Sequence, residues 1–189
     1  MSEEMFDVLD ENGVPTGQTV ERKQAHIDGT WHRAVLIFVV NNKNKVLLQK
    51  RSMTKSKWSG RWCATAGGHV ESGDIGLYAV MRELEEEIGI SVRASDVRYI
   101  ETHRSCNKGK GIDAHFNEYY VVHKNVRLKD VKIQESEVEE VKWLDYFDVR
   151  KMIEERSSKL TEKWTGFDAF VRYMDKYLNA KGEIKNGGR

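Results

Sequence analysis

The segment "GGHVESGDIGLYAVMRELEEEIGI", residues 67–90, joins a glycine-rich stretch to a helix pattern crowded with glutamates. Apolar residues recur at intervals of three and four along its second half, which is the period of a helix with one buried face. These apolar residues are Leu77, Val80, Met81, Leu84 and Ile88. The spacing predicts a helix that begins near residue 74 and ends at Gly89.

Three glutamates share one flank of this predicted helix. Successive helical residues are rotated by about 100°, so Glu83, Glu86 and Glu87 fall together at the border of the apolar face, half in water, and Glu85 projects toward solvent. Like charges at this spacing repel by roughly 0.2–0.5 kcal/mol per pair, and no lysine or arginine follows any of the three by four residues. Carboxylate oxygens suit Mg²⁺ or Mn²⁺. We therefore expect these three glutamates to bind Mg²⁺ or Mn²⁺.

Glycines directly precede the helix, in the stretch "AGGHVESG" at residues 66–73. Because glycine has no side chain, the backbone at Gly67 and Gly68 can come close to a ligand just before a helix begins. A charge-rich helix face is most often solvated surface, and a glycine loop alone is a weak signal. Their combination favours a site for a cation and a phosphate-bearing substrate.

The rest of the chain predicts an α+β fold with a mixed sheet between helical layers. An N-terminal hairpin is expected around Asn12, Gly13 and Pro15, followed by a short helix that ends at Gly29. Apolar or β-branched runs predict strands, and helical spacing predicts two late helices. The strands are expected in 33–40, 45–51, 97–103, 116–123 and 140–144, and the helices in 145–157 and 165–178.

Composition excludes several classes of protein. The 31 basic and 30 acidic residues nearly balance, so the broad positive charge of a nucleic-acid binder is missing. The longest apolar run, at residues 34–40, is too short to cross a bilayer, and the start has no signal-peptide pattern. Cys63 and Cys106 form no disulfide framework or metal-ligand spacing. We expect a cytoplasmic protein that binds neither membrane nor nucleic acid, with surfaces that would suit a homodimer.

The segment 68–90 resembles the Nudix box, the signature of the Nudix hydrolase family. The box is matched from Gly68 through the run Arg82 to Ile90, and Asp74 alone stands where the family has a glutamate. The resemblance covers about residues 30–155, which we expect to form the Nudix domain. Around it we expect residues 1–29 as a hairpin and short helix packed on the domain, 156–180 as a C-terminal helix and 181–189 as a disordered tail.

The resemblance implies an enzyme that hydrolyses a diphosphate linked to another group, with a nucleoside diphosphate derivative as the default substrate. Cations on the clustered carboxylates would neutralise charge and acidify the attacking water. Glu83 would be a metal ligand that can also act on the water. In related enzymes a glutamate on a later loop takes that role, and Glu137 is the local candidate.

The stretch "QKRSMTKSKWSGRWCATAGGH", residues 49–69, resembles the subgroup that contains isopentenyl-diphosphate isomerase. By that similarity Arg51 and Lys55 would hold the substrate diphosphate, which their charges complement. Those isomerases carry a catalytic cysteine directly before a Gly-His pair, and this chain has Gly67 there. We therefore rank a hydrolase first, an isomerase-like enzyme second and a non-catalytic diphosphate-binding regulatory module third.

The same subgroup suggests a second metal site. Its isomerases bind a cation with three histidines and two glutamates, and this chain matches them at His26, His32, His69 and Glu118, with Phe116 where the other glutamate is expected. Three imidazoles and a carboxylate suit Zn²⁺ or Mn²⁺. A histidine beside a strand is more often a hydrogen-bonded core or surface residue, so this site ranks below the carboxylate site.

Overall fold

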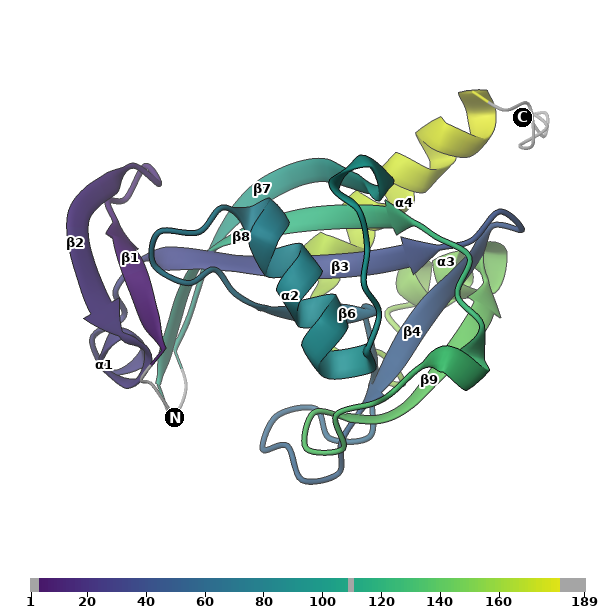
Figure 1. The fold of residues 1–189 in the computed structure, drawn as a ribbon, viewed down its shortest axis with the longest axis horizontal. Helices are drawn as coiled ribbons and strands as arrows, with labels where there is room; N and C mark the ends of the chain where they lie inside the picture. Colours follow the sequence, from purple (N-terminus) through teal and green to yellow (C-terminus); the bar gives the residue numbers. More distant parts are fainter. Residues whose placement is uncertain (1–3, 109–110, 181–189) are drawn as a thin grey trace.

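A mixed seven-stranded sheet forms the centre of the protein in the computed structural model, which describes residues 4–108 and 111–180 (Figure 1). The strand order is β5-β4-β3-β8-β7, with β6 paired to β3 and β9 paired to β4. The pairing of β3 with β8 is parallel and the other pairings are antiparallel. The strands are β3 His32–Val40, β4 Lys45–Arg51, β5 Trp62–Cys63, β6 Ala66–His69, β7 Val97–Lys108, β8 Ile112–His123 and β9 Val138–Asp145.

Helices cover both faces of this sheet. Helix α2, Gly76–Ile88, lies on one face, and α3, Tyr146–Glu154, and α4, Trp164–Ala180, lie on the other (Figure 1). Side chains alternate along a strand, so Val35 and Ile37 of β3 pack under α2 while Leu36 and Phe38 pack toward α4. This two-sided burial explains the unbroken apolar run of β3. The predicted α+β sandwich is confirmed.

Helix α2 follows the predicted apolar period. It begins two residues later than expected, at Gly76, and ends where Gly89 adopts a left-handed backbone with φ 68°. The amide of Gly89 bonds back to the carbonyls of Glu85 and Leu84, which closes the last turn. Val80, Leu84 and Ile88 are fully buried. Burying each such side chain contributes roughly 1.5–3 kcal/mol, which fixes the helix on the sheet and sets where its glutamates lie.

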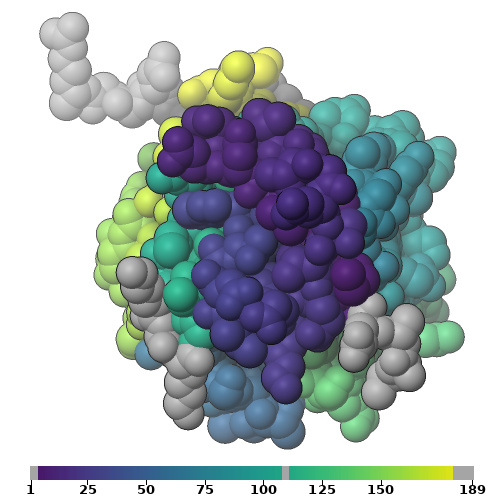
Figure 2. Space-filling model, turned by 90° about the vertical axis from the view of Figure 1, so that its left-hand side faces the viewer, coloured from purple at the N-terminus to yellow at the C-terminus, as the bar shows by residue number. Residues whose placement is uncertain are grey.

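The N-terminal segment packs on one end of the sheet. Strands β1, Met5–Leu9, and β2, Pro15–Glu21, form the expected hairpin, and α1, Arg22–Asp28, is the expected short helix ending at Gly29. β1 packs on β3 and α1 packs on β8. Viewed from that end, these residues form much of the surface (Figure 2).

Three features of the fold differ from the sequence prediction. The strand ranges predicted from the sequence leave out residues 52–96, but Cys63 and Gly67 lie on two short strands, β5 and β6, separated by Ala64 and Thr65. The buried Thr65 hydroxyl bonds to the backbone of β3 and β4 there, so the chain changes pairing between the two short strands. Cys63 is buried in the core. Strands β7 and β8 are longer than expected, and short 3₁₀ turns occur at η1 Ala94–Asp96 and η2 Leu128–Asp130.

The predicted disordered tail at 181–189 lies outside the described residues. Within 4–108 and 111–180, no helix is both long enough and apolar enough to cross a membrane.

Candidate active site and a cluster of histidines

The glycine-rich strand β6 makes room for the glutamates of α2. Gly68 pairs with Val35 of β3 and faces α2. A β-carbon added to Gly68 would lie 2.6 Å from Oε2 of Glu83 and closer still to Oε1. Only glycine allows so close an approach of carboxylate and backbone, so β6 and α2 together fix the position of Glu83.

Two of the expected cation ligands are more buried than the sequence suggested. Glu83 and Glu87 are 8% and 5% exposed, whereas Glu86 is exposed. The expectation that all three lie half in water is therefore wrong for Glu83 and Glu87. Burial raises the pKa of Glu83 to about 7, and burial together with the charge of Glu83 raises the pKa of Glu87 to about 8. The side-chain amide of Gln49 donates to Glu87 Oε2 over 2.8 Å.

Arg82 partly compensates the glutamates. Its Nη1 lies 3.0 Å from Glu83 Oε1 and 3.4 Å from Glu86 Oε2, and its Nη2 donates to the carbonyl of His69 over 2.7 Å. The sequence prediction rested only on basic residues four positions after each glutamate, and Arg82 instead stands four positions before Glu86. The helix itself therefore does provide an ion pair for these glutamates.

The residues around these glutamates fit a divalent cation. One guanidinium faces several carboxylates, since Arg82 Nη1 also lies 3.4 Å from Glu71 Oε1. Among the described residues, the buried Oε1 of Gln49 has no hydrogen-bond partner, although the same amide holds Glu87. Carboxylate and amide oxygens with water form the donor set that Mg²⁺ or Mn²⁺ takes. Glu83, Glu86 and Glu87 would supply the charged part of such a set.

Glu137 and Lys55 form an ion pair next to the glutamates. Lys55 Nζ donates to both carboxylate oxygens of Glu137, over 2.7 Å and 2.6 Å, and both side chains are partly buried. The amide of Gln134 bonds to the carbonyl of Glu87, and the amide of Glu137 bonds to the carbonyl of Gln134, so the loop that carries Glu137 lies against the end of α2. The amide of Ser52 also bonds to the carbonyl of Glu137, so the two loops are tied together.

The other basic residues have different surroundings. Arg51 Nε donates to the carbonyl of Lys57 over 3.2 Å, and Lys57 Nζ donates to Asp113 over 2.8 Å. Sequence reasoning missed Lys163, whose charge lowers the pKa of Glu87 and so opposes the effect of burial. It directly precedes α4, in a stretch with no phosphate-binding motif to draw attention to it.

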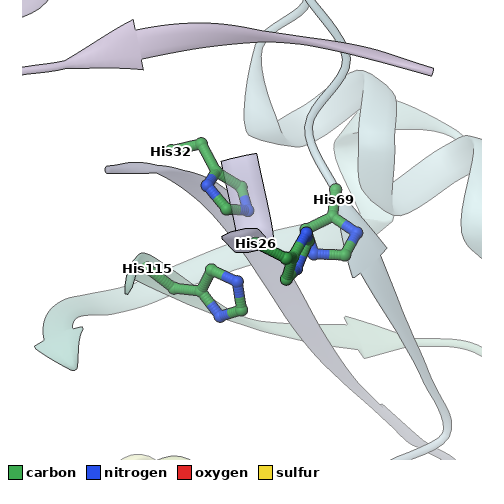
Figure 3. Close-up of side chains that lie close together, drawn as sticks. All are labelled: His26, His32, His69 and His115. Carbon is green, nitrogen blue, oxygen red and sulfur yellow. The ribbon is translucent and has the colours of Figure 1, made fainter. Parts of the chain in front are cut away.

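Four histidines converge at the end of the sheet beneath the N-terminal segment (Figure 3). They come from α1, β3, β6 and β8, and one nitrogen of each lies within 4.8 Å of the others. The residues are His26, His32, His69 and His115. The first three are those that the isomerase resemblance indicated, and sequence reasoning missed the fourth.

Glu118, the carboxylate expected beside these histidines, lies on the opposite face of β8. It pairs with Val35, faces α2 and accepts a hydrogen bond from the Tyr120 hydroxyl over 2.6 Å. His115 is three residues earlier and therefore points the other way, paired directly with His32 in the parallel register of β3 and β8. That register is the signal that would have identified His115.

The environment of His32, His69 and His115 favours their neutral form. Burial lowers the pKa of His32 to about 4 and of His115 to about 3, and it lowers the pKa of His69 well below its ordinary value. His32 Nδ1 lies 2.7 Å from the carbonyl of Thr30, and His26 Nδ1 lies 2.7 Å from the carbonyl of Arg22. A carbonyl only accepts hydrogen bonds, so each of these Nδ1 atoms carries a hydrogen, and the neutral His32 ring keeps its lone pair on Nε2.

Known proteins have amino-acid sequences similar to that of this chain. The NUDIX domain profile matches residues 30–164. Nudix hydrolase 3 of Arabidopsis thaliana is 36% identical over 81% of this chain, and the chain spans only 21% of that relative's length. An uncharacterized Nudix hydrolase of Listeria innocua is 30% identical over 97% of this chain and 96% of its own length. An isopentenyl-diphosphate Δ-isomerase of Escherichia coli is 28% identical over 98% of this chain and 100% of its own length.

Solved structures share the fold. The DR0079 protein of Deinococcus radiodurans aligns with a TM-score of 0.68 at 16% identity, over 90% of this chain and 99% of its own. The Nudix domain of Shewanella oneidensis NrtR, solved with ADP ribose, aligns with a TM-score of 0.56 at 18% identity. The alignment covers 82% of this chain and 94% of the NrtR chain. The chain has a glutamate-rich helix packed against a strand that contains glycines, and the NUDIX profile matches most of its length. It therefore belongs to the Nudix hydrolase family.

Proposed function

We propose that the protein is a pyrophosphohydrolase that uses Mg²⁺ or Mn²⁺ to cleave a diphosphate linkage in a small molecule. The observation that carries this proposal is the pair of buried carboxylates, Glu83 and Glu87, beside the exposed Glu86. Buried carboxylates with incomplete compensation are costly unless a cation joins them. When bound, the cation would neutralise phosphate charge and lower the pKa of a bound water.

In this proposal Lys55 first binds the substrate diphosphate, and Glu137 then acts as the base. In the structure Lys55 forms an ion pair with Glu137. A diphosphate competes for the Lys55 ammonium, since phosphate oxygens are strong acceptors of charge-assisted hydrogen bonds. The Glu137 carboxylate is then free to accept a proton from the attacking water, with Glu83 as the alternative base. Arg51, with the backbone of Gly67 and Gly68, supports the remaining phosphate oxygens.

The default substrate is a nucleoside diphosphate derivative. The NrtR Nudix domain was solved with ADP ribose, which makes that compound the first to test. Prenyl, sugar and coenzyme diphosphates follow in the same series. The free thiols of Cys63 and Cys106 agree with the cytoplasmic location that we include in the proposal.

An isomerase-like activity is the second candidate, because relatives with that name span nearly the whole chain. The structure offers no thiol at the place where those isomerases carry one. A β-carbon at Gly67 would lie 2.7 Å from the carbonyl oxygen of Val35, so the position has no room for a cysteine side chain without a backbone shift. Cys63 is buried and receives a hydrogen bond from Thr161. We therefore retain the hydrolase as the conclusion.

The test is a screen of diphosphate compounds with Mg²⁺ or Mn²⁺, scored for phosphate and monophosphate release. Isopentenyl diphosphate is included and analysed for both hydrolysis and isomerisation. The Glu86→Gln variant and chelator-treated protein serve as controls. Metal-dependent release from at least one compound is expected. Isomerisation without hydrolysis would replace the proposal with the isomerase, and no turnover with cation bound would favour a regulatory diphosphate-binding module.

A further inference from the structure

The four histidines form a set of ligands that is complete without any carboxylate. Their ring centroids lie between 4.6 Å, for His32 and His115, and 5.7 Å, for His26 and His115. A tetrahedral zinc ion with bonds of about 2.0–2.1 Å holds its nitrogens about 3.3 Å apart. The nitrogens here lie within 4.8 Å, so small side-chain rotations would close the four rings around an ion.

The unpaired ring nitrogens point to a ligand. Within the described residues, Nε2 of His32 and Nε2 of His115 are buried without a hydrogen-bond partner. Leaving such atoms unpaired in the interior costs free energy. In proteins, histidines that bind metals commonly donate their other ring N–H to a backbone carbonyl. His32 and His26 both do so here, through Thr30 and Arg22.

Carboxylates at the edge of the cluster would balance the charge of a dication. Asp113 Oδ1 lies 3.8 Å from His26 Nε2, and Glu4 Oε1 lies 3.8 Å from His69 Nδ1. The fully buried ring of Phe6 stacks on His32 and packs on His69, at centroid distances of 4.6 Å and 4.7 Å. The cluster is therefore covered by β1.

We propose that His26, His32, His69 and His115 bind one Zn²⁺-like transition-metal ion in a closed structural site that fastens α1 to the sheet. Four protein ligands leave no open position for water or substrate, which is the arrangement of structural rather than catalytic zinc. Imidazole also suits Zn²⁺ better than Mg²⁺, which prefers oxygen. His26 is the ligand from α1, and the other three belong to the sheet.

This site is separate from the glutamates. His69 and Gly68 are neighbours on β6 but face opposite sides of the sheet, because successive strand residues alternate. Gly68 faces Glu83 and His69 faces the other histidines. The structural site should thus bind its metal whether or not the glutamates bind theirs.

Metal content tests the proposal directly. Protein is purified without chelator, its affinity tag is removed, and bound zinc is measured by mass spectrometry after dialysis with Zn²⁺. We expect one zinc per chain in the wild type and in Glu86→Gln, and at least a tenfold loss in His115→Ala. His103→Ala is the matched control, because His103 pairs with Glu101 away from the cluster. Replacement by Co²⁺ should give the intense absorption of a tetrahedral ion.

The structural role has its own readouts. Zn²⁺ at a hundredfold excess over its Kd should raise Tm by about 5–10 °C and slow amide exchange in α1, and both effects should vanish in His26→Gln. This variant changes a partly exposed side chain on α1, so it answers the question even if His115→Ala fails to fold. Equal zinc content in wild type and both histidine variants would overturn the site. Bound zinc without any change in α1 exchange would overturn its structural role.

Discussion

The carboxylate of Glu83 occupies the space where any residue other than glycine at position 68 would place its β-carbon. Gly68→Ala should therefore force the Glu83 carboxylate out of its position beside β6. A misplacement of about 1 Å in a catalytic group can lower a rate about 100-fold. We expect kcat/KM with Mg²⁺ to fall by about that factor, measured on the best substrate of the screen.

A double-mutant cycle separates this effect from general loss of stability. If Gly68 serves to make room for Glu83, then adding Gly68→Ala to Glu83→Ala should cost little further activity. The thermal midpoint of each variant is recorded alongside. An equal loss from Gly68→Ala in both backgrounds would show that the glycine has another role.

The Lys55–Glu137 pair should affect substrate binding more than stability. Partly exposed ion pairs contribute about 0.2–1 kcal/mol, so Lys55→Met should remain folded. It should raise KM for a diphosphate substrate and leave the Mn²⁺ Kd within about twofold, since Lys55 contacts Glu137 and not the three glutamates proposed as metal ligands.

Lys50→Met is the control for this change, because Lys50 lies in the same basic stretch, on β4. Its kinetics should match the wild type. Unchanged KM in Lys55→Met would remove Lys55 from the substrate site, whereas a large loss of Mn²⁺ affinity would place it at the cation instead.

The buried glutamates should make metal-free stability depend on pH. The pKa of Glu87 is about 8 in the folded protein, above its ordinary value of 4.5. The folded state then binds more protons than the unfolded chain between these values, so Glu87 lowers the free energy of unfolding as pH rises from about 4.5 to 8. Comparing wild type with Glu87→Gln in the presence of a chelator separates the contribution of Glu87 from that of the histidines.

Urea unfolding at pH 5, 6, 7 and 8 measures the contribution of Glu87 to the free energy of unfolding. The stability of Glu87→Gln relative to wild type should increase with pH, and saturating Mg²⁺ should stabilise the wild type most at pH 8, where the carboxylates are ionised. A difference between the two proteins that is constant with pH would contradict the raised pKa.

Local patterns in the sequence were sufficient to predict much of this fold. The three- and four-residue spacing of apolar residues identified α2, and Gly89 marked its end because its left-handed backbone suits glycine. The short strands β5 and β6 were not resolved as separate elements. They have two and four residues, which is too few for a period to show, and the buried Thr65 between them redirects the chain.

The histidine cluster shows what a local pattern cannot supply. His115 and Glu118 are close in sequence, and only the register of β8 against β3 decides which of them faces His32. The burial of Glu87 likewise depends on packing against β4, where Gln49 lies, and on the loop that carries Glu137. These are contacts between residues far apart in the chain, and one sequence alone does not specify them.

The most direct test of the account compares Glu85 and Glu86, adjacent exposed glutamates on α2. Of these two residues, Glu86 lies on the same flank of the helix as Glu83, because Arg82 contacts both Glu83 and Glu86. Calorimetric titration with Mn²⁺ should show binding at least about tenfold weaker in Glu86→Gln and within about twofold of wild type in Glu85→Gln. Equal losses in the two variants would contradict the assignment of the cation to this face of the helix.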